Sequence, residues 1–371
     1  MKALAALSSE IKPLFGPIRD RPQIPSPLWN FFQWDPLENK PLSADKALLY
    51  CQVYCHEAEE LLAQRPKDLE DLNLSLKELL KQFHPISLLL HLREKNLKNP
   101  QGPYASPFLH KARYNQQAKL KGQMGEHPYL AFTHPGEGYK NQNEDGILLQ
   151  NKQKMLILSD GMGGLSKGYA ASGVVLDFLE KALNEDKDPL QAAIQAQEAL
   201  LARSKLEKIL GQPSTLGCTL VMAQIAEGYV QIWHMGDSKA MVIREGKILS
   251  QTQDHSKGQE LFYKRLVNEE TARQLGHILS RGLGDSEQDL NQYMEKTRIP
   301  LQEGDRLLLA TDGITDNYFG KSFDLSSLAQ AASLPSLEES LDHIQQNCLE
   351  KMRLGIGKPD NLRLALLDYQ A

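Results

Sequence analysis

Two different hydrophobic patterns divide this chain of 371 residues. In the N-terminal part apolar residues recur every three or four positions, which predicts helices over 43–64, 68–83 and about 86–95. Ser43 stands where a residue would cap the first of these helices. Residues 10–41 are rich in proline, so regular structure is not expected there. The first part of the chain is therefore predicted to be helical, after an irregular start.

From Tyr129 onward, short apolar runs bounded by turn residues predict strands. Two of them form an expected hairpin at 146–150 and 154–158, and two helices follow. The remaining expected strands lie at 219–225, 229–234, 239–243, 306–310 and 362–367. The expected helices lie at 169–183, 189–210, 258–274, 325–332 and 336–351. Strand and helix blocks with hairpins predict a layered α+β domain with mostly antiparallel sheets.

The stretch 98–128 is rich in Gly, Pro, Gln and Lys, and it is the expected linker between these two parts. We therefore predict an N-terminal helical accessory region over 1–125 and a catalytic domain over 126–371. The apolar stripes of the accessory helices are explained most simply as core. The open alternative is a protein partner, bound through Trp29, Phe31, Phe32 and Trp34.

Composition narrows the class of protein. A hydrophobic content of 41% and a charged content of 24% indicate a globular chain. The net charge is −5. The excess of acidic residues lies after residue 128, which argues against nucleic-acid binding. No run of about 18 apolar residues is present, so no membrane span is expected. The four cysteines form no disulfide framework, and Cys51-x₃-Cys55 fits one helix face better than a zinc site. We expect a cytoplasmic protein, with export into another cell left open.

The chemistry is concentrated where predicted strands end. Asp160-Gly161 follows the apolar run 155–158, and Asp312-Gly313 follows the similar run 307–310. Further acidic residues stand at comparable positions: Glu144, Asp145, Asp237 and Asp360. Clustered carboxylates repel one another unless a hard cation lies among them, and oxygen ligands favour Mg²⁺ or Mn²⁺. The pattern predicts a metal-dependent hydrolase with two ions.

A single Asp-Gly is more often only a turn, but the whole string of motifs is specific. It comprises Lys140 to Asp145, Asp160 to Gly164, Gly217 to Leu220, Gly236 to Lys239, Asp254 to Ser256, Leu279 to Asp285, Leu308 to Gly313 and Lys358 to Asn361. In order and spacing these motifs resemble the protein phosphatase 2C family over about Tyr129 to Asp368. Met162, after Asp160-Gly161, resembles the bacterial branch.

The resemblance implies a β-sandwich of two antiparallel sheets flanked by helices, with two Mn²⁺ or Mg²⁺ ions, or three. It implies that Asp160 bridges two ions and that the Gly161 carbonyl binds one of them. Asp312 and Asp360 would complete the first site, and Glu144 and Asp145 would serve the second. Asp237, with Asp312, is where bacterial relatives hold a third ion. Lys140 stands where the family has a phosphate-gripping Arg, so phosphate binding should be weaker.

The implied reaction is hydrolysis of phosphoserine or phosphothreonine in proteins by a hydroxide that bridges the metals, with no covalent enzyme intermediate. Asp160, Asp312 and Lys140 are the expected catalytic residues. Two alternatives stay open: a pseudophosphatase that binds phosphoproteins without efficient turnover, and an enzyme acting on a partner-switching regulator.

Overall fold

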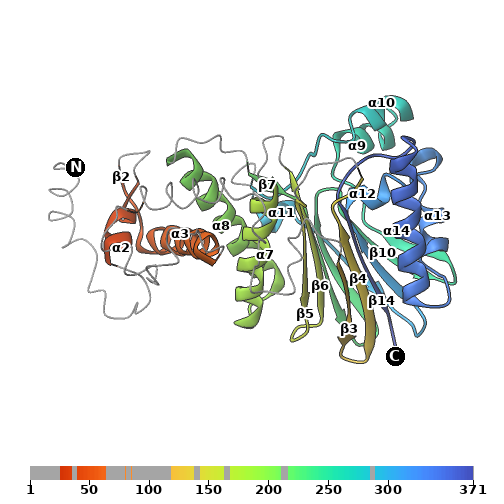
Figure 1. Ribbon diagram of the computed structural model, residues 1–371, viewed down its shortest axis with the longest axis horizontal. Helices are drawn as coiled ribbons and strands as arrows, with labels where there is room; N and C mark the ends of the chain where they lie inside the picture. Colours follow the sequence, from red (N-terminus) through yellow and green to blue (C-terminus); the bar gives the residue numbers. More distant parts are fainter. Residues whose placement is uncertain are drawn as a thin grey trace. The chain divides into compact units, whose positions relative to one another are not determined.

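The computed structural model describes residues 26–35, 40–63, 80, 85, 118–137, 143–162, 168–209, 216–284 and 289–370. The chain divides into two compact units (Figure 1). The first comprises Met1–Pro107 with Ala202–Ser214, and the second comprises Phe108–Leu201 with Thr215–Ala371. The expected helices over 68–83 and 86–95 lie almost wholly outside the described residues, so they stay predictions.

The second unit is built on two antiparallel sheets. In the first sheet the strands lie in the order β11 (Lys247–Gln251), β10 (Lys239–Arg244), β13 (Arg306–Ala310), β14 (Leu362–Asp368), β4 (His127–His134) and β3 (Ala118–Met124). In the second the order is β12 (Glu295–Pro300), β9 (Tyr229–Met235), β8 (Leu220–Ala226), β6 (Met155–Met162) and β5 (Asp145–Gln150), with β7 (Gly217–Cys218) beside β6. This confirms the predicted sandwich.

Helices cover the outer face of each sheet, as Figure 1 shows. One apolar cluster joins the second sheet to α7 (Gly168–Asn184) and to the first part of α8 (Pro189–Ile209). Another joins the first sheet to α13 (Ser326–Ala331) and α14 (Leu337–Arg353). A third lies between the sheets. The central strands are thus buried on both faces, which explains why their sequences are continuous apolar runs rather than alternating ones.

Strand β3 corrects the expected linker. It lies inside the stretch 98–128, pairs with β4, and starts before residue 126. Its polar sequence suits an edge strand, because Lys119 and Lys121 point outward and pair with Asp342 and Glu338 of α14. The assignment of residues 1–125 as an accessory domain stays a prediction.

The helix expected over 258–274 is two helices, α9 (Lys257–Tyr263) and α10 (Glu269–Gln274). The break follows from Arg265, whose φ of 58° cannot continue a helix, and from Asn268, whose side chain accepts a hydrogen bond from the Thr271 amide at 2.8 Å and starts the next one. Strands β11 and β12 are not among the strands expected from the sequence. Their side chains alternate between exposed and partly buried, so their apolar signal is weak.

The first unit contains α2 (Ser26–Phe32), a two-stranded sheet of β1 (Trp34–Asp35) and β2 (Lys40–Pro41), and α3 (Ala44–Ala63). The prediction of irregular structure over 10–41 is therefore wrong for α2, which tolerates Pro27 because that residue lies in its first turn. Trp29 and Phe32 are buried, and the Phe32 ring packs edge-on against Tyr50 and Tyr54 of α3, so neither is an exposed anchor for a partner.

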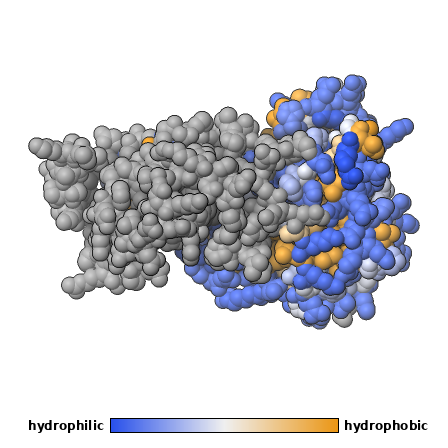
Figure 2. Space-filling model, in the orientation of Figure 1, coloured by the Kyte–Doolittle hydropathy of each residue, from blue (hydrophilic) through white to orange (hydrophobic). Residues whose placement is uncertain are grey.

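On the face in view, the described surface is mainly hydrophilic, with hydrophobic residues in smaller patches (Figure 2). Among the helices that the structure describes, none has both the length and the apolar character needed to cross a bilayer.

Candidate metal centre

The centre begins with two carboxylates that face each other across adjacent strands. Asp145 opens β5, and it lies directly opposite Asp160 near the end of β6. The Thr311 hydroxyl donates a hydrogen bond to Asp145 Oδ2 at 2.8 Å, and the Asp160 amide donates to Thr219 Oγ1 at 2.9 Å. The first bond fixes the carboxylate of Asp145, and the second fixes the backbone at Asp160. Like charges directly opposite on a sheet destabilise it, so this pair needs a cation or a proton.

The other sheet contributes the next two carboxylates. Asp312 starts the one-turn helix α12 (Asp312–Thr315) immediately after β13, and Asp360 stands just before β14. The chain segments approach closely here, because a Cβ on Gly313 would lie 2.0 Å from the Asn361 carbonyl oxygen. Only glycine permits this approach. The ends of both sheets therefore bring four predicted ligands to one place.

Burial and mutual repulsion act on these groups together. Burial, with repulsion from Asp145, Asp312, Asp360 and Asp237, raises the pKa of Asp160 well above its ordinary value. Burial also raises the pKa of Asp145 to about 6, against the attraction of Arg363. Burial and the charge of Asp312 raise the pKa of Asp360 to about 7. These directions describe a carboxylate cluster that lacks enough positive charge of its own.

Asp237 belongs to the same cluster. It lies in the turn between β9 and β10, and burial followed by repulsion from Asp312 raises its pKa well above the ordinary value. The adjacent Ser238 hydroxyl lies 2.6 Å from Thr219 Oγ1, the atom that also binds the Asp160 amide. Thr219 therefore joins the turn of Asp237 to the strand of Asp160. The sequence motif gave Thr219 no such role.

Glu144 lies beside the carboxylate cluster. Its Oε1 accepts a hydrogen bond from the Gly168 amide at 3.2 Å, at the start of α7. Its own amide donates to Asn361 Oδ1 at 2.8 Å, and its carbonyl oxygen accepts from the Gly161 amide at 3.1 Å. These bonds fix the main chain around Gly161. Metal binding by Glu144 and by the Gly161 carbonyl stays a prediction, and Lys140 lies outside the described residues.

The centre contains three further charged residues to which the sequence motifs assigned no role. Asp316 follows Asp312 by one helical turn, and burial raises its pKa to about 6. Arg363 on β14 is fully buried, and its pKa falls to about 10, although Asp145 and Asp160 oppose that fall. Lys358 forms ion pairs with Asp312, Asp316 and Asp360. The i, i+4 spacing of Asp312 and Asp316 and the place of Lys358 in the motif Lys358 to Asn361 were the available sequence signals.

The donor set fits Mn²⁺ or Mg²⁺. Every predicted side-chain ligand offers carboxylate oxygen, the type that these hard cations prefer. The raised pKa values of Asp145, Asp160, Asp237 and Asp360 have burial and like-charge repulsion as their physical causes, and divalent cations would relieve the repulsion.

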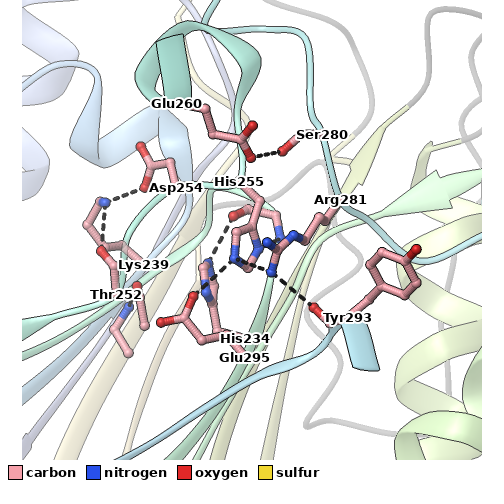
Figure 3. Close-up of polar contacts among 12 residues, drawn as sticks. His234, Lys239, Thr252, Asp254, His255, Glu260, Ser280, Arg281, Tyr293 and Glu295 are labelled. Atoms are coloured by element: carbon pink, nitrogen blue, oxygen red, sulfur yellow. Dashed lines mark hydrogen bonds and ion pairs between the residues drawn. The ribbon is translucent and has the colours of Figure 1, made fainter. Parts of the chain in front are cut away.

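A second group of possible ligands comprises His234, His255 and Glu295 (Figure 3). The two imidazole rings are stacked, with centroids 4.4 Å apart and planes at 26°. A metal ion binds imidazole in the plane of the ring, so two stacked rings cannot direct their lone pairs at one ion. The His255 ring also accepts a hydrogen bond from the Gly236 amide at 3.2 Å and lies 3.1 Å from Glu295 Oε2. This group is a structural support beneath α9.

Comparison with known proteins agrees with the geometry. The protein phosphatase 2C family model matches residues 134–352. The serine/threonine protein phosphatase PstP of Mycobacterium tuberculosis is 27% identical over 247 residues, covering 62% of this chain and 44% of that protein. The serine/threonine phosphatase stp of Listeria welshimeri is 30% identical over 197 residues, covering 48% of this chain and 74% of that protein. The chain thus spans less than half of the length of the mycobacterial relative.

Among solved structures, the catalytic domain of the phosphatase PstP in complex with two manganese ions has a TM-score of 0.53 and 25% identity. The match covers 65% of this chain and 97% of that one. The staphylococcal phosphatase Stp1 of Staphylococcus aureus has a TM-score of 0.54 and 25% identity, covering 67% of this chain and 97% of that one. Because the family model spans more than half of the chain and ends of both sheets form the expected carboxylate cluster, the chain belongs to the protein phosphatase 2C family.

Proposed function

We propose that this chain hydrolyses phosphoserine and phosphothreonine in proteins with the help of Mn²⁺ or Mg²⁺. The observation that carries the proposal is the opposition of Asp145 and Asp160 across β5 and β6, with Asp312, Asp360 and Asp237 around them. The relatives named above are serine/threonine phosphatases, and one was solved with two manganese ions. Family, fold and carboxylate cluster thus support one activity.

In the mechanism, two divalent cations would supply an activated water and neutralise charge on the phosphoryl oxygens. The chain's own residues fix the geometry. Asp160 would hold both ions, because its carboxylate interacts with both Asp145 and Asp312. Asp312 and Asp360 would complete one ion's ligands. Thr219 and Thr311 hold Asp160 and Asp145 in place through hydrogen bonds of 2.9 and 2.8 Å.

Lys140 is the proposed phosphate-binding side chain, on the strength of its place in the motif before Glu144. As a point charge it would attract the phosphate without the paired hydrogen bonds that an arginine offers. Binding of the substrate phosphate is therefore proposed to be weaker than in relatives with arginine.

A direct assay tests the proposal. The purified full chain, freed of metal, should release no phosphate from a phosphothreonine peptide, and added Mn²⁺ should start the reaction. Turnover that continues in the metal-free protein would reject the metal mechanism. Tight binding of the phosphopeptide without any release of phosphate in Mn²⁺ would instead support the pseudophosphatase alternative, which no observation on the described residues favours.

We further propose a cytoplasmic location, supported by the four cysteines being free thiols. Cell fractionation would test it, and recovery of the protein outside the cell would favour export. A protein partner for the N-terminal helices is also proposed, on the amphipathic pattern of residues 43–64. Because Trp29 and Phe32 are buried, exposed side chains of α3 such as Asp45 and Lys46 would have to mediate that contact.

A further inference from the structure

Lys358 places a fixed positive charge inside the carboxylate cluster. Its Nζ forms an ion pair with Asp312, lies 2.9 Å from Asp316 Oδ2 and lies 3.3 Å from Asp360 Oδ2. Two of these three carboxylates, Asp312 and Asp360, are the proposed ligands of one ion. The lysine therefore binds one oxygen of each of the two carboxylates that this ion would need.

The loop before β14 holds Lys358 in this position. The buried Asn317 side chain donates hydrogen bonds to the Lys358 carbonyl oxygen at 3.0 Å and to the Gly313 carbonyl oxygen at 2.7 Å. A Cβ on Gly357 would lie 2.2 Å from Asn317 Oδ1, so this side chain is pressed against the loop. The backbone of Lys358 is thus tied to α12, the helix that carries Asp312.

The ion pairs of Lys358 are confined to one end of the cluster. Its ammonium group contacts Asp312, Asp316 and Asp360, whereas among the described residues no lysine forms an ion pair with Asp160 or Asp237. The protein itself therefore supplies positive charge at the Asp312–Asp360 end of the cluster.

We propose that Lys358 is an internal counter-ion that occupies the Asp312–Asp360 position in the metal-free protein and must leave it before a divalent cation binds. Because a hard dication binds carboxylate oxygen at about 2.1 Å, an ammonium group bound to the same two carboxylates opposes it by charge repulsion and competes with it for space. The lysine would stabilise the metal-free protein and weaken its apparent metal affinity. This inference rests on the proposed metal-dependent function.

The size of the effect follows from competition. If the lysine occupies the site in about nine of ten metal-free molecules, the apparent dissociation constant rises about tenfold. Removing the charge should therefore tighten Mn²⁺ binding at one site by about tenfold and lower the melting temperature of the metal-free protein. Replacing the lysine with arginine keeps the charge, so affinity should stay close to that of the wild type.

The experiment is a calorimetric Mn²⁺ titration of the full chain, with thermal unfolding of the metal-free proteins. It compares the wild type with Lys358→Met, Lys358→Gln and Lys358→Arg. Lys247→Met, at an exposed lysine on β11, is the control for loss of one charge. Tighter Mn²⁺ binding by Lys358→Met and Lys358→Gln, with Lys358→Arg and the control unchanged, supports the inference. The Gln variant decides the question if the Met variant does not fold.

Three results would overturn it. If the wild type binds Mn²⁺ and neither neutral variant binds it more tightly, the inference is wrong while the proposed function stands. If the Arg variant binds as tightly as Met and Gln, charge is not the cause and the inference is also wrong. A wild-type chain that binds no Mn²⁺ at all, with Asp160→Asn no different, would reject the proposed function together with the inference.

Discussion

Two polar clusters of the second unit differ in how their charges are satisfied. In the His234, His255 and Glu295 group, hydrogen bonds to Gly236 and between His255 and Glu295 serve most of the polar atoms (Figure 3). In the carboxylate cluster, Asp145, Asp160, Asp237 and Asp360 all have raised pKa values. Both groups consist of metal-binding residue types.

Residue type therefore does not identify a metal site by itself. Stacked imidazoles that bind the backbone support a loop, whereas facing carboxylates that repel one another require added positive charge.

The strongest test replaces Asp160 with asparagine. A neutral amide is a poor ligand for a hard dication, so activity should fall by more than about 100-fold, the upper range for residues that only support a ligand. Because one repelling charge is removed, the metal-free variant should melt at or above the wild-type temperature. Phosphopeptide kinetics and calorimetry measure both effects, with Asp324→Asn on the surface as control. Unchanged Mn²⁺ binding would contradict the assignment of Asp160 as a metal ligand. Asp312→Asn should lose activity to a similar extent.

The second test changes the pH. Asp145 and Asp360 have folded pKa values of about 6 and about 7, against an ordinary value of 3.8. Between about pH 4 and pH 7 the folded metal-free protein therefore binds more protons than the unfolded chain. Its carboxylate repulsion is present above pH 7 and is relieved as the pH falls. The melting temperature of the Mn²⁺-loaded protein should therefore exceed that of the metal-free protein by less at about pH 5.5 than at about pH 7.5.

Comparing loaded with metal-free protein matters because burial lowers the pKa of His234 and of His255, which destabilises both forms in acid. That contribution cancels in the difference. A difference that is constant across this range, or that grows in acid, would show that the carboxylates do not titrate as described.

The third test concerns Lys140. Its replacement by alanine should raise KM for a phosphothreonine peptide, with a loss in kcat/KM of about 1–2 kcal/mol, or about 5- to 30-fold. Lys140→Arg should lower KM, because the guanidinium offers paired hydrogen bonds. Steady-state kinetics at saturating Mn²⁺ measure both variants. Wild-type constants for Lys140→Ala would place this side chain away from the phosphate.

The smallest effect is expected at the histidine cluster. Glu295→Gln keeps an acceptor for His255, so the free energy of unfolding should fall by no more than about 1 kcal/mol. The number of bound Mn²⁺ ions should not change. Thermal unfolding and calorimetric stoichiometry check the two expectations. Loss of one bound ion in this variant would mean that the stacked pair does hold metal.

The sequence predicted most of the sandwich because its central strands are covered on both faces. The apolar runs at 155–158, 307–310 and 362–367 are short, which favours buried strands over buried helix segments. The edge strand β3 was missed for the opposite reason, since its outward lysines make it resemble a linker. Likewise the break between α9 and α10 depends on the left-handed backbone of Arg265, which composition does not reveal.

For the site, the motifs located the clustered carboxylates Asp145, Asp160, Asp312 and Asp360, because these residues stand at strand ends beside strong apolar runs. They could not show that Lys358 pairs with Asp312 or that Arg363 lies buried next to Asp145, since both contacts join segments distant in the sequence. The balance of charge within the cluster depends on contacts made by the fold, so local sequence patterns do not predict it.

Gly161 and Gly168 impose a constraint on how this protein can evolve. A Cβ on either residue would lie 2.1 Å from the carbonyl oxygen of the other, where the end of β6 meets the start of α7. Each glycine is required because of its partner's backbone, which no substitution removes, so a change at one position cannot be compensated by a change at the other. In a library of variants, both positions should be closed to every other amino acid, singly and in combination.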